Sequence, residues 1–323
     1  MHPTNPKLIL PGGAGFLGQL LADWFTERGW NVVILTRRPA SDRPGIHYLQ
    51  WDGETLGPWT DELEGAEAVV NLAGRSVNCR YHYRNRRTML NSRLNSTRVL
   101  GDAVRACRTP PRVWLNSSTA TIYKHSFDQP MDEDGEIAAT PAAKDEFSVE
   151  IATRWERAFE DAVTPKTRKA ALRTAMVLAD VPGTVYCVLR RLARLGLGGS
   201  MGSGEQYVSW LHHVDFCRAV EWLINRDDVA GAVNLAAPEP VTNREMMRIF
   251  RRTFGVPIGL PATEWMLEMG AFLMRTETEL VIKSRRVVPG RLLEAGFEFE
   301  YSQFGAAIRE LAGVRDTQPA VCA

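Results

Sequence analysis

Apolar residues in the first half of the chain fall into short continuous runs, separated by longer stretches with helical spacing. A short run predicts a buried strand, and apolar residues that recur every three or four positions predict a helix. Strands are expected at residues 8–10, 31–35, 46–50, 68–72, 113–115 and 170–178, and helices at 17–25, 84–105 and 153–162. Strands that alternate with helices predict an α/β fold, with a doubly wound parallel sheet covered by helices on both faces.

The pattern changes beyond residue 178. A glycine-rich stretch at 196–204 predicts a flexible loop, 233–235 predicts a short strand, and the Thr242-x-x-Glu245 spacing predicts a capped helix start. Residues 260–274 are apolar and rich in methionine. They belong to the core or form a lid over a pocket, and the core is the favoured interpretation. We therefore expect a smaller C-terminal α/β part beside the sheet.

Composition and charge narrow the possible partners. The 323 residues are 45% hydrophobic and 24% charged, with a formal net charge of +1. A charge so close to zero gives no reason to expect binding to nucleic acid or to an anionic membrane. No apolar run is long enough to span a bilayer, and the first residues lack the apolar core of a signal peptide.

The cysteines favour a reducing compartment. There are five of them, an odd number, and no two form a C-x-x-C pair. This pattern predicts free thiols in a cytoplasmic protein rather than disulfides or a zinc site. No group of His, Cys or carboxylate residues has the spacing of metal ligands, so no metal is expected.

A glycine-rich turn lies between the first predicted strand and the first predicted helix. Gly13-x-Gly15-x-x-Gly18 fits the usual dinucleotide fingerprint, and Gly12-x-x-Gly15-x-x-Gly18 fits a longer variant. Such glycines allow a tight turn, close approach of the backbone to a pyrophosphate, and packing of the helix on the strand. The helix N-terminus then offers free N–H groups to the phosphates. An ordinary glycine-rich turn is the alternative, but the strand–turn–helix context favours a dinucleotide site.

The end of the second predicted strand indicates which dinucleotide. NAD-binding folds carry an Asp or Glu there, which accepts hydrogen bonds from the ribose 2′-hydroxyl. This chain has Arg37 and Arg38 instead. A guanidinium group binds a 2′-phosphate through charge-assisted hydrogen bonds, whereas a carboxylate would repel it. The sequence therefore favours NADP as the cofactor over NAD.

Several longer segments together resemble one family. They read PGGAGFLG (11–18), LTRRP (35–39), VVNLAG (69–74), NSRLNSTR (91–98), NSSTA (116–120), RWE (154–156), SWLHHVD (209–215), GAVNLAAPEPVTN (231–243) and VVPGRLLEAGFEF (287–299). The chain resembles an extended short-chain dehydrogenase/reductase. It is most similar to the atypical branch described as sugar-nucleotide epimerase-related, or NAD(P)-dependent epimerase/dehydratase-like, which has its own C-terminal extension. The resemblance covers almost the whole chain.

The resemblance implies a division of the chain and a set of cofactor residues. It implies an NADP-binding Rossmann domain at residues 1–180, to which 208–236 returns, and a substrate-binding part made of 181–207 and 237–323. By position, it implies that the cofactor contacts Gly12, Gly15, Phe16, Leu17, Gly18, Arg37, Arg38, Asp52, Leu72, Ala73, Gly74 and Ser117.

One departure from the family pattern bears directly on catalysis. Catalytic members carry Tyr-x-x-x-Lys one helix after the serine-rich strand end, where the Tyr exchanges a proton with the substrate hydroxyl. Here Ser148 and Ala152 stand at these positions, and a shift by one residue gives Phe147 and Ile151. Neither register supplies an acid and a base, so the standard proton relay is expected to be absent.

Substitutes for the relay are limited. Ser117 or Ser118 would polarise the substrate oxygen, and Tyr123, just beyond the serine strand end, would donate the proton. Further candidates are Tyr81, His82 and Tyr83 after the fourth strand, Lys124 and His125 beside Tyr123, and His212 and Asp215 in a family motif, for which a structural role is favoured.

Two functions follow from these features. The first is an NADP-dependent oxidoreductase or epimerase-like enzyme that acts on a small polar molecule, with a nucleotide sugar as one candidate. The second is a non-catalytic NADP(H)-binding sensor or scaffold that has kept the cofactor site and lost the relay. A small-molecule substrate is the expected partner, and the sequence leaves open whether the protein is a monomer or a homodimer.

Overall fold

The structure, a computed structural model, describes residues 5–273 and 279–314. Within them, a seven-stranded parallel sheet has the strand order β10-β6-β5-β4-β1-β2-β3. Its strands are β1 (Lys7–Pro11), β2 (Asn31–Thr36), β3 (Ile46–Gln50), β4 (Ala68–Asn71), β5 (Val113–Thr119), β6 (Arg168–Thr174) and β10 (Gly231–Leu235). The predicted α/β fold of the Rossmann type is thereby confirmed.

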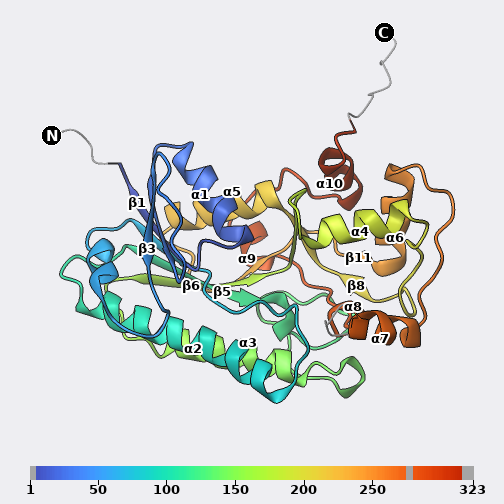
Figure 1. Ribbon diagram of the computed structural model, residues 1–323, viewed down its shortest axis with the longest axis horizontal. Helices are drawn as coiled ribbons and strands as arrows, with labels where there is room; N and C mark the ends of the chain where they lie inside the picture. The colour runs from blue at the N-terminus through green and yellow to red at the C-terminus, as the bar shows by residue number, and fades with distance from the viewer. Residues whose placement is uncertain (1–4, 274–278, 315–323) are drawn as a thin grey trace, which may run out of the picture.

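Helices cover both faces of the sheet. The helices α1 (Phe16–Thr26) and α5 (His213–Asn225) lie on one face, and α2 (Tyr83–Ala106) and α3 (Glu146–Glu160) lie on the other (Figure 1). Successive side chains of a strand point to opposite faces. Leu8 and Leu10 accordingly pack with α1 and α5, whereas Ile9 packs with the α2 side. Burial on both faces explains why the strands read as continuous apolar runs.

Two predicted elements differ from the structure in their bounds. Helix α3 begins at Glu146 rather than at 153, because Phe147 and Ile151 extend its buried stripe toward the N-terminus. The predicted strand 170–178 is two strands: β6 stays in the main sheet, and β7 (Met176–Leu178) leaves it to pair with β9 (Trp210–His212). The chain changes direction at Ala175, between the two strands, and passes into the C-terminal part.

The C-terminal part has a core of its own. The elements of this part are α4 (Val185–Arg194), β8 (Tyr207–Val208), β11 (Val241–Thr242), α6 (Asn243–Thr253), α7 (Glu264–Leu273), α8 (Glu279–Ile282), α9 (Gly290–Glu294) and α10 (Phe304–Leu311). Leu292 on α9 packs in the core of the main sheet instead. Helix α6 starts as predicted, because the hydroxyl of Thr242 accepts a hydrogen bond from the backbone N–H of Glu245 at 3.2 Å. Residues 231–235 return to the main sheet, where β10 pairs with β6.

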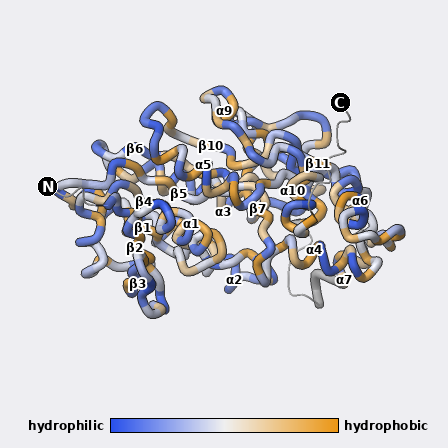
Figure 2. Tube along the Cα trace, turned by 90° about the horizontal axis from the view of Figure 1, so that it is seen from above, coloured by the Kyte–Doolittle hydropathy of each residue, from blue (hydrophilic) through white to orange (hydrophobic). Residues whose placement is uncertain are grey.

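The core interpretation of residues 260–274 is wrong for the part that the structure describes. Trp265 and Met269 on α7 are 62% and 63% exposed, and Leu260 just before the helix is 62% exposed. Helix α7 lies at the end of the molecule remote from the sheet (Figure 2), and among its described side chains Leu267 packs against the C-terminal core. Apolar composition alone did not reveal that most of the described side chains between 260 and 269 face outward. Met274 lies outside the described residues.

The described cysteines agree with free thiols. Cys79, Cys107, Cys187 and Cys217 form no disulfide, and Cys322 lies outside the described residues. None of the helices formed by residues 5–273 and 279–314 combines the length and the apolar character needed to cross a bilayer.

Candidate functional site

The glycine-rich turn between β1 and α1 requires glycine at three places for packing. A Cβ on Gly13 would lie 2.7 Å from the Cβ of Leu10. Gly12 has a φ of +76°, and a Cβ on it would lie 2.6 Å from the Cα of Ala73. A Cβ on Gly18 would lie 2.3 Å from the Cα of Gly13, so α1 could not rest on the turn. Gly15 differs, because its Cβ would meet only the carbonyl oxygen of Gly12, at 3.8 Å. The space beside Gly15 is therefore open to a ligand.

The N-terminus of α1 is available for an anion. Gly15 is its N-cap residue, no side chain caps this end, and no acidic residue lies in the first turn. The free N–H groups of an uncapped helix end attract phosphate through hydrogen bonds and the helix dipole. The turn thus fits the pyrophosphate of a dinucleotide.

A cleft of about 720 Å³ opens beside this turn. Its walls are the turn, the ends of β2 and β4, the loop after β3 and the N-terminal half of α2. The lining residues are Gly12, Ala14, Gly15, Leu35, Thr36, Arg37, Trp51, Asp52, Gly53, Glu54, Leu72, Ala73, Gly74, Arg75, Arg84, Arg87, Thr88, Asn91, Ser92 and Ser96. The cleft therefore lies at the carboxyl ends of parallel strands, where α/β folds bind their ligands.

The structure gathers most of the predicted cofactor residues in this cleft. Those that line it are Gly12, Gly15, Arg37, Asp52, Leu72, Ala73 and Gly74. Phe16, Leu17, Gly18, Arg38 and Ser117 are not lining residues; Gly18 serves the packing of helix on turn, and Phe16 and Leu17 pack against the core. The fingerprint mixes residues that face the ligand with residues that shape the turn, and the sequence pattern does not separate them.

The charged side chains of Arg37 and Asp52 differ in their partners within the protein. Arg37 is exposed at the end of β2 and forms no ion pair with the described residues. The carboxylate of Asp52 accepts hydrogen bonds from the backbone N–H groups of Glu54 and Thr55 at 2.8 and 2.9 Å, and from the Thr55 hydroxyl. These bonds, the hydroxyl first, lower the pKa of Asp52. Asp52 therefore stabilises its own turn, while the Arg37 guanidinium is free to meet an anion.

The sequence analysis did not predict that polar residues of α2 and of the segment before it form one wall of the cleft. Arg75, Arg84 and Arg87 line the cleft together with Asn91 and Ser92. The signal was present in the sequence, since arginines cluster between 75 and 87 directly after the Asn71–Gly74 segment. Their side chains give the cleft a positive lining, which suits a ligand with several phosphate charges.

The serine strand end presents two faces. The buried hydroxyl of Ser118 donates a hydrogen bond to Glu156 and is enclosed by α3. Ser117 and Thr119 project from the opposite face and are half-buried. The hydroxyl oxygen of Thr119 accepts a hydrogen bond from the N–H of Thr121 at 3.2 Å. The hydroxyls of Ser117 and Thr119 are thus less enclosed than that of Ser118, although neither residue lines the cleft, and Thr119 was missed by the sequence prediction.

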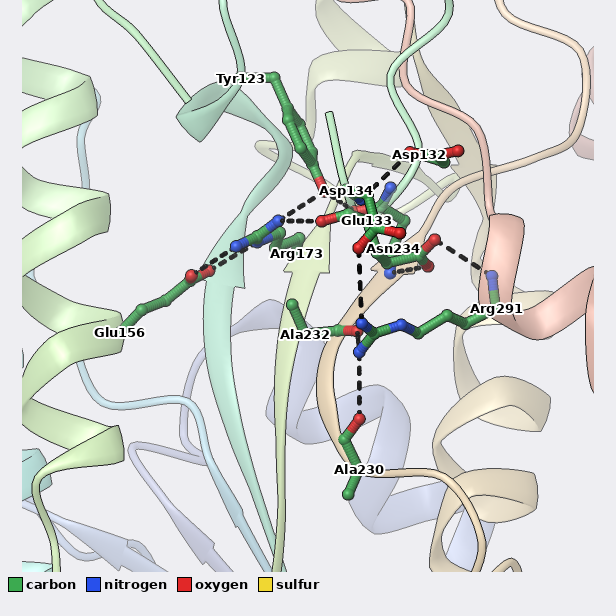
Figure 3. Close-up of polar contacts among 10 residues, drawn as sticks. All are labelled: Tyr123, Asp132, Glu133, Asp134, Glu156, Arg173, Ala230, Ala232, Asn234 and Arg291. Atoms are coloured by element: carbon green, nitrogen blue, oxygen red, sulfur yellow. Dashed lines mark hydrogen bonds and ion pairs between the residues drawn. The ribbon is translucent and has the colours of Figure 1, made fainter. Parts of the chain in front are cut away.

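Tyr123 lies inside the fold, which removes the geometric basis for its predicted role as proton donor. Its side chain is 1% exposed. Its hydroxyl donates a hydrogen bond to Oδ1 of Asn234 at 2.8 Å and accepts one from Nη1 of Arg173 at 2.7 Å (Figure 3). Burial outweighs the nearby guanidinium and raises the pKa of Tyr123 to about 12. The hydroxyl thus has a structural role within the fold.

Arg173 is the centre of this buried network. Its Nε and Nη2 donate to both carboxylate oxygens of Glu156 at 2.9 and 2.8 Å. Glu133 accepts a hydrogen bond from the N–H of Asn234 at 2.8 Å and one from the N–H of Arg291 at 3.1 Å (Figure 3). The network ties α3, β6 and β10 to the segment that leads into α9, and it explains why these polar residues are buried: each has a charged or hydrogen-bonding partner.

A second buried polar group lies where the Tyr-x-x-x-Lys relay was sought. The Ser148 hydroxyl on α3 donates a hydrogen bond to Oε2 of Glu279 on α8 at 2.9 Å. Next to it, Nζ of Lys283 lies 2.6 Å from Oδ2 of Asp145 and donates to the carbonyl of Thr121 at 2.7 Å. We call Asp145, Ser148, Glu279 and Lys283 the α8 cluster. It joins the start of α3 to the C-terminal part, just beyond the end of β5.

The pKa values in the α8 cluster are shifted by burial. Glu279 is 4% exposed, and burial raises the pKa of its carboxyl despite the Ser148 hydrogen bond and the charges of Arg285 and Lys283. Burial also lowers the pKa of Lys283, although Asp145 opposes this shift. The Ala152 side chain is fully buried and carries no polar group. The α8 cluster therefore brings an acid to the place where sequence reasoning found none.

The remaining candidates have structural partners. Lys124 pairs with Glu136 at 2.8 Å, and Nδ1 of His125 accepts a hydrogen bond from the N–H of Ser284 at 2.9 Å. The buried His212 ring lies 2.9 Å from Oε2 of Glu310, and burial lowers its pKa to about 3. The other four lie outside the cleft lining. Asp215 accepts from the N–H groups of Glu300 and Tyr301, Nδ1 of His82 accepts from the N–H of Asn85 at 3.4 Å, Tyr81 packs on Phe147, and Tyr83 is exposed.

Among the residues that the structure describes, no three His, Cys, Asp or Glu side chains are grouped so that they could hold a metal ion. The fold and the cleft instead define a Rossmann-type protein with a dinucleotide site at the first glycine-rich turn.

Comparison with known proteins agrees with this class. The sequence profile of the NAD dependent epimerase/dehydratase family matches residues 8–158, and that of a domain of unknown function (DUF1731) matches residues 262–311. The cattle epimerase family protein SDR39U1 is 30% identical over 311 residues, which cover 94% of this chain and 99% of the relative. The chain therefore belongs to the epimerase/dehydratase family, and the resemblance inferred from its sequence motifs is confirmed.

Solved structures show the same fold. A crystal structure of human epimerase family protein SDR39U1 with NADPH has a TM-score of 0.83 at 27% identity and covers 95% of this chain and 99% of that chain. A nucleoside-diphosphate sugar epimerase from Corynebacterium glutamicum has a TM-score of 0.75 at 25% identity, covering 95% of this chain and 58% of that one.

Proposed function

We propose that this chain is an NADP-dependent enzyme of the oxidoreductase or epimerase type that acts on a small polar substrate, with a nucleotide sugar as the leading candidate. The observation that carries the proposal is the cleft itself. An uncapped helix end, the open space beside Gly15 and the unpaired guanidinium of Arg37 meet in one cavity. The NADPH named for the human relative and the sugar substrate class named for the Corynebacterium relative support it.

The residues that would hold the cofactor follow from the lining of the cleft. Gly12 and Gly15 allow the backbone to approach the diphosphate, Arg37 would meet the 2′-phosphate, and Leu72 to Gly74 form the opposite wall. Bound NADP would supply hydride transfer at its nicotinamide ring. The chain's own contribution is to orient the ligand, to polarise the substrate oxygen through the hydroxyls of Ser117 and Thr119, and to supply a proton.

The proton would come from the α8 cluster rather than from Tyr123. A carboxyl with a raised pKa can keep its proton closer to neutral pH and act as a general acid. Glu279 is such a group, and its hydrogen bond to Ser148 links it to the position of the missing tyrosine. The charged groups around it are Asp145, Lys283 and Arg285.

The test is turnover at the nicotinamide. NADP+ is incubated with the protein and with a panel of uridine-diphosphate sugars that carry deuterium on their ring carbons, and transfer of the label to C4 of the nicotinamide is followed by mass spectrometry. Label movement that depends on the sugar supports the enzyme. The control variant Arg98→Gln, changed at an exposed residue of α2, should move the label as the wild type does.

A non-catalytic NADP(H)-binding sensor or scaffold is the second candidate. It is favoured by Ser148 and Ala152, which stand at the expected positions of the relay tyrosine and lysine, and by the burial of Tyr123. Tight NADPH binding without label movement for any sugar would favour this function. Free thiols at the four described cysteines fit a cytoplasmic location for either function.

A further inference from the structure

Arg93 is a buried cation without a counter-ion among the described residues. It lies in the middle of α2 and is 9% exposed. Its Nη1 donates to the carbonyl oxygens of Arg75 and Met89, both at 3.0 Å, and its guanidinium lies 5.0 Å from the ring of Trp155. None of these partners carries a negative charge.

The pKa of Arg93 also reflects that its buried positive charge has no carboxylate beside it among the described residues. Burial lowers its pKa to about 10, and the groups that oppose the shift are Tyr81 and Cys79, with no carboxylate among them. Arg173 shows the contrast: this other buried arginine of the fold has both oxygens of Glu156 as its partners. An arginine stays protonated in proteins, so a buried guanidinium needs a negative partner from somewhere.

The position of Arg93 shows where that partner would come from. A Cβ placed on Gly74 would lie 3.2 Å from the Cζ of Arg93, so the guanidinium lies directly against the Gly74 backbone. Gly74 and Arg75 line the cleft, as do Ser92 and Ser96 on the same helix. Arg93 itself is not a lining residue, but its neighbours on two sides are, so its guanidinium lies directly behind the Gly74 wall of the cavity.

We propose that Arg93 binds the diphosphate group of a ligand in this cleft. Nη1 is used by the backbone carbonyls, whereas no hydrogen bond of Nε or Nη2 is made within the described residues. These two nitrogens form a fork that matches two oxygens of a phosphate. The arginines of the cleft, Arg37, Arg75, Arg84 and Arg87, outnumber its carboxylates, Asp52 and Glu54, so a ligand with several charges fits better than a single carboxylate.

Two kinds of ligand contain a diphosphate group: the dinucleotide cofactor and a nucleoside-diphosphate substrate. The inference rests on the proposed function, because it takes the cleft to be a nucleotide site. Arg93→Gln is the main variant, since glutamine keeps an N–H donor for the backbone carbonyls and removes the charge. Arg98→Gln, at an exposed position five residues along α2, is the matched control.

The experiment measures the dissociation constants of three ligands by calorimetry. They are NADPH, adenosine 2′-monophosphate, which lacks the diphosphate, and uridine diphosphate added to protein saturated with NADPH or, if NADPH does not bind, to the free protein. If the cofactor supplies the diphosphate, Arg93→Gln weakens NADPH about tenfold or more and leaves adenosine 2′-monophosphate unchanged. If the substrate supplies it, only the affinity for uridine diphosphate falls by that factor.

A second measurement covers the possibility that the variant folds poorly. The unfolding temperature of the ligand-free protein is compared for wild type, Arg93→Gln and Arg93→Lys. A cation that awaits a ligand can be replaced with little loss of stability in the ligand-free protein, and Arg93→Lys weakens binding because it lacks the fork. If Arg93→Gln and Arg93→Lys are both unfolded without ligand, Arg93 has a purely structural role and the proposal is overturned.

Failure of this proposal is distinguishable from failure of the proposed function. Wild-type protein that binds NADPH, with folded Arg93→Gln binding NADPH and uridine diphosphate equally well, overturns the role of Arg93 alone. Wild-type protein that binds no NADPH overturns the proposed function, while the uridine diphosphate arm still tests Arg93. Absence of binding in every arm overturns both.

Discussion

The Ser148 hydroxyl donates a 2.9 Å hydrogen bond to Oε2 of Glu279, a residue 131 positions further along the chain. The motif resemblance in the sequence assigns Ser148 to the position of the relay tyrosine. Glu279 belongs to the segment matched by the domain of unknown function. A carboxyl from the segment matched by that domain therefore reaches Ser148 on α3, which makes Glu279 the residue whose titration is most worth measuring.

The first prediction concerns Glu279 and pH. Its folded pKa is raised, so the folded protein holds this proton more tightly than the unfolded chain does. Below the unfolded pKa of about 4.3, the carboxyl is protonated in both states, and its burial destabilises the folded protein least. As the pH rises from there to the folded pKa, the unfolded chain loses the proton first, and the stability of the folded protein falls. Glu279→Gln should therefore raise the unfolding temperature at pH 7 and change it little at pH 4.

Thermal unfolding followed by circular dichroism at both pH values measures this effect. Glu268→Gln, at an exposed carboxylate of α7, is the control and should show no such difference between the two pH values. A stabilisation of Glu279→Gln that is equal at pH 4 and pH 7 would contradict the raised pKa.

The second prediction concerns cofactor choice. Arg37→Ala should weaken NADPH by about 1.5–3 kcal/mol, roughly tenfold or more, because a charge-assisted contact to the 2′-phosphate is lost. The affinity for NADH, which has no 2′-phosphate, should not change. Calorimetric titration with both cofactors measures this, and Arg38→Ala is the matched control outside the cleft lining. Equal affinity of the wild type for NADPH and NADH would contradict the assignment of Arg37.

The third prediction separates two kinds of glycine in the turn. Gly15→Val should abolish NADPH binding and leave the protein folded, because the new side chain enters the open space beside the turn. Gly18→Val should unfold or strongly destabilise the protein, since even a Cβ would lie 2.3 Å from the Cα of Gly13. Circular dichroism and NADPH fluorescence titration of both variants test this pair. A folded Gly15→Val protein with normal binding would show that Gly15 serves only the turn.

The fourth prediction concerns Tyr123. Tyr123→Phe removes a buried hydroxyl and leaves Nη1 of Arg173 and Oδ1 of Asn234 each without one partner. The free energy of unfolding should fall by about 1–3 kcal/mol, and NADPH affinity should stay the same. Denaturant unfolding and fluorescence titration measure the two quantities. Unchanged stability together with a loss of turnover would restore Tyr123 as the proton donor.

The amino-acid sequence by itself determined the strand–helix alternation, the glycine-rich turn and the arginines at the end of β2. These features depend on local periodicity and on residues close together in the chain, such as Gly12 to Gly18 and Arg37. A strand buried on both faces must read as an apolar run, and a helix that starts at a phosphate site must begin near glycine. Such constraints act within one element, so they can be recognised without knowing the partners of that element.

Only the tertiary structure decided which polar residues are available to a ligand. Ser118 and Tyr123 follow the expected strand end, yet Glu156 and Arg173 enclose them in the core. Arg93 looked like one charge of a polar helix, and the packing of α2 on α3 buried it beside Gly74. The burial and the pKa of a charged group depend on side chains brought from distant parts of the chain, and local periodicity carries no information about those partners.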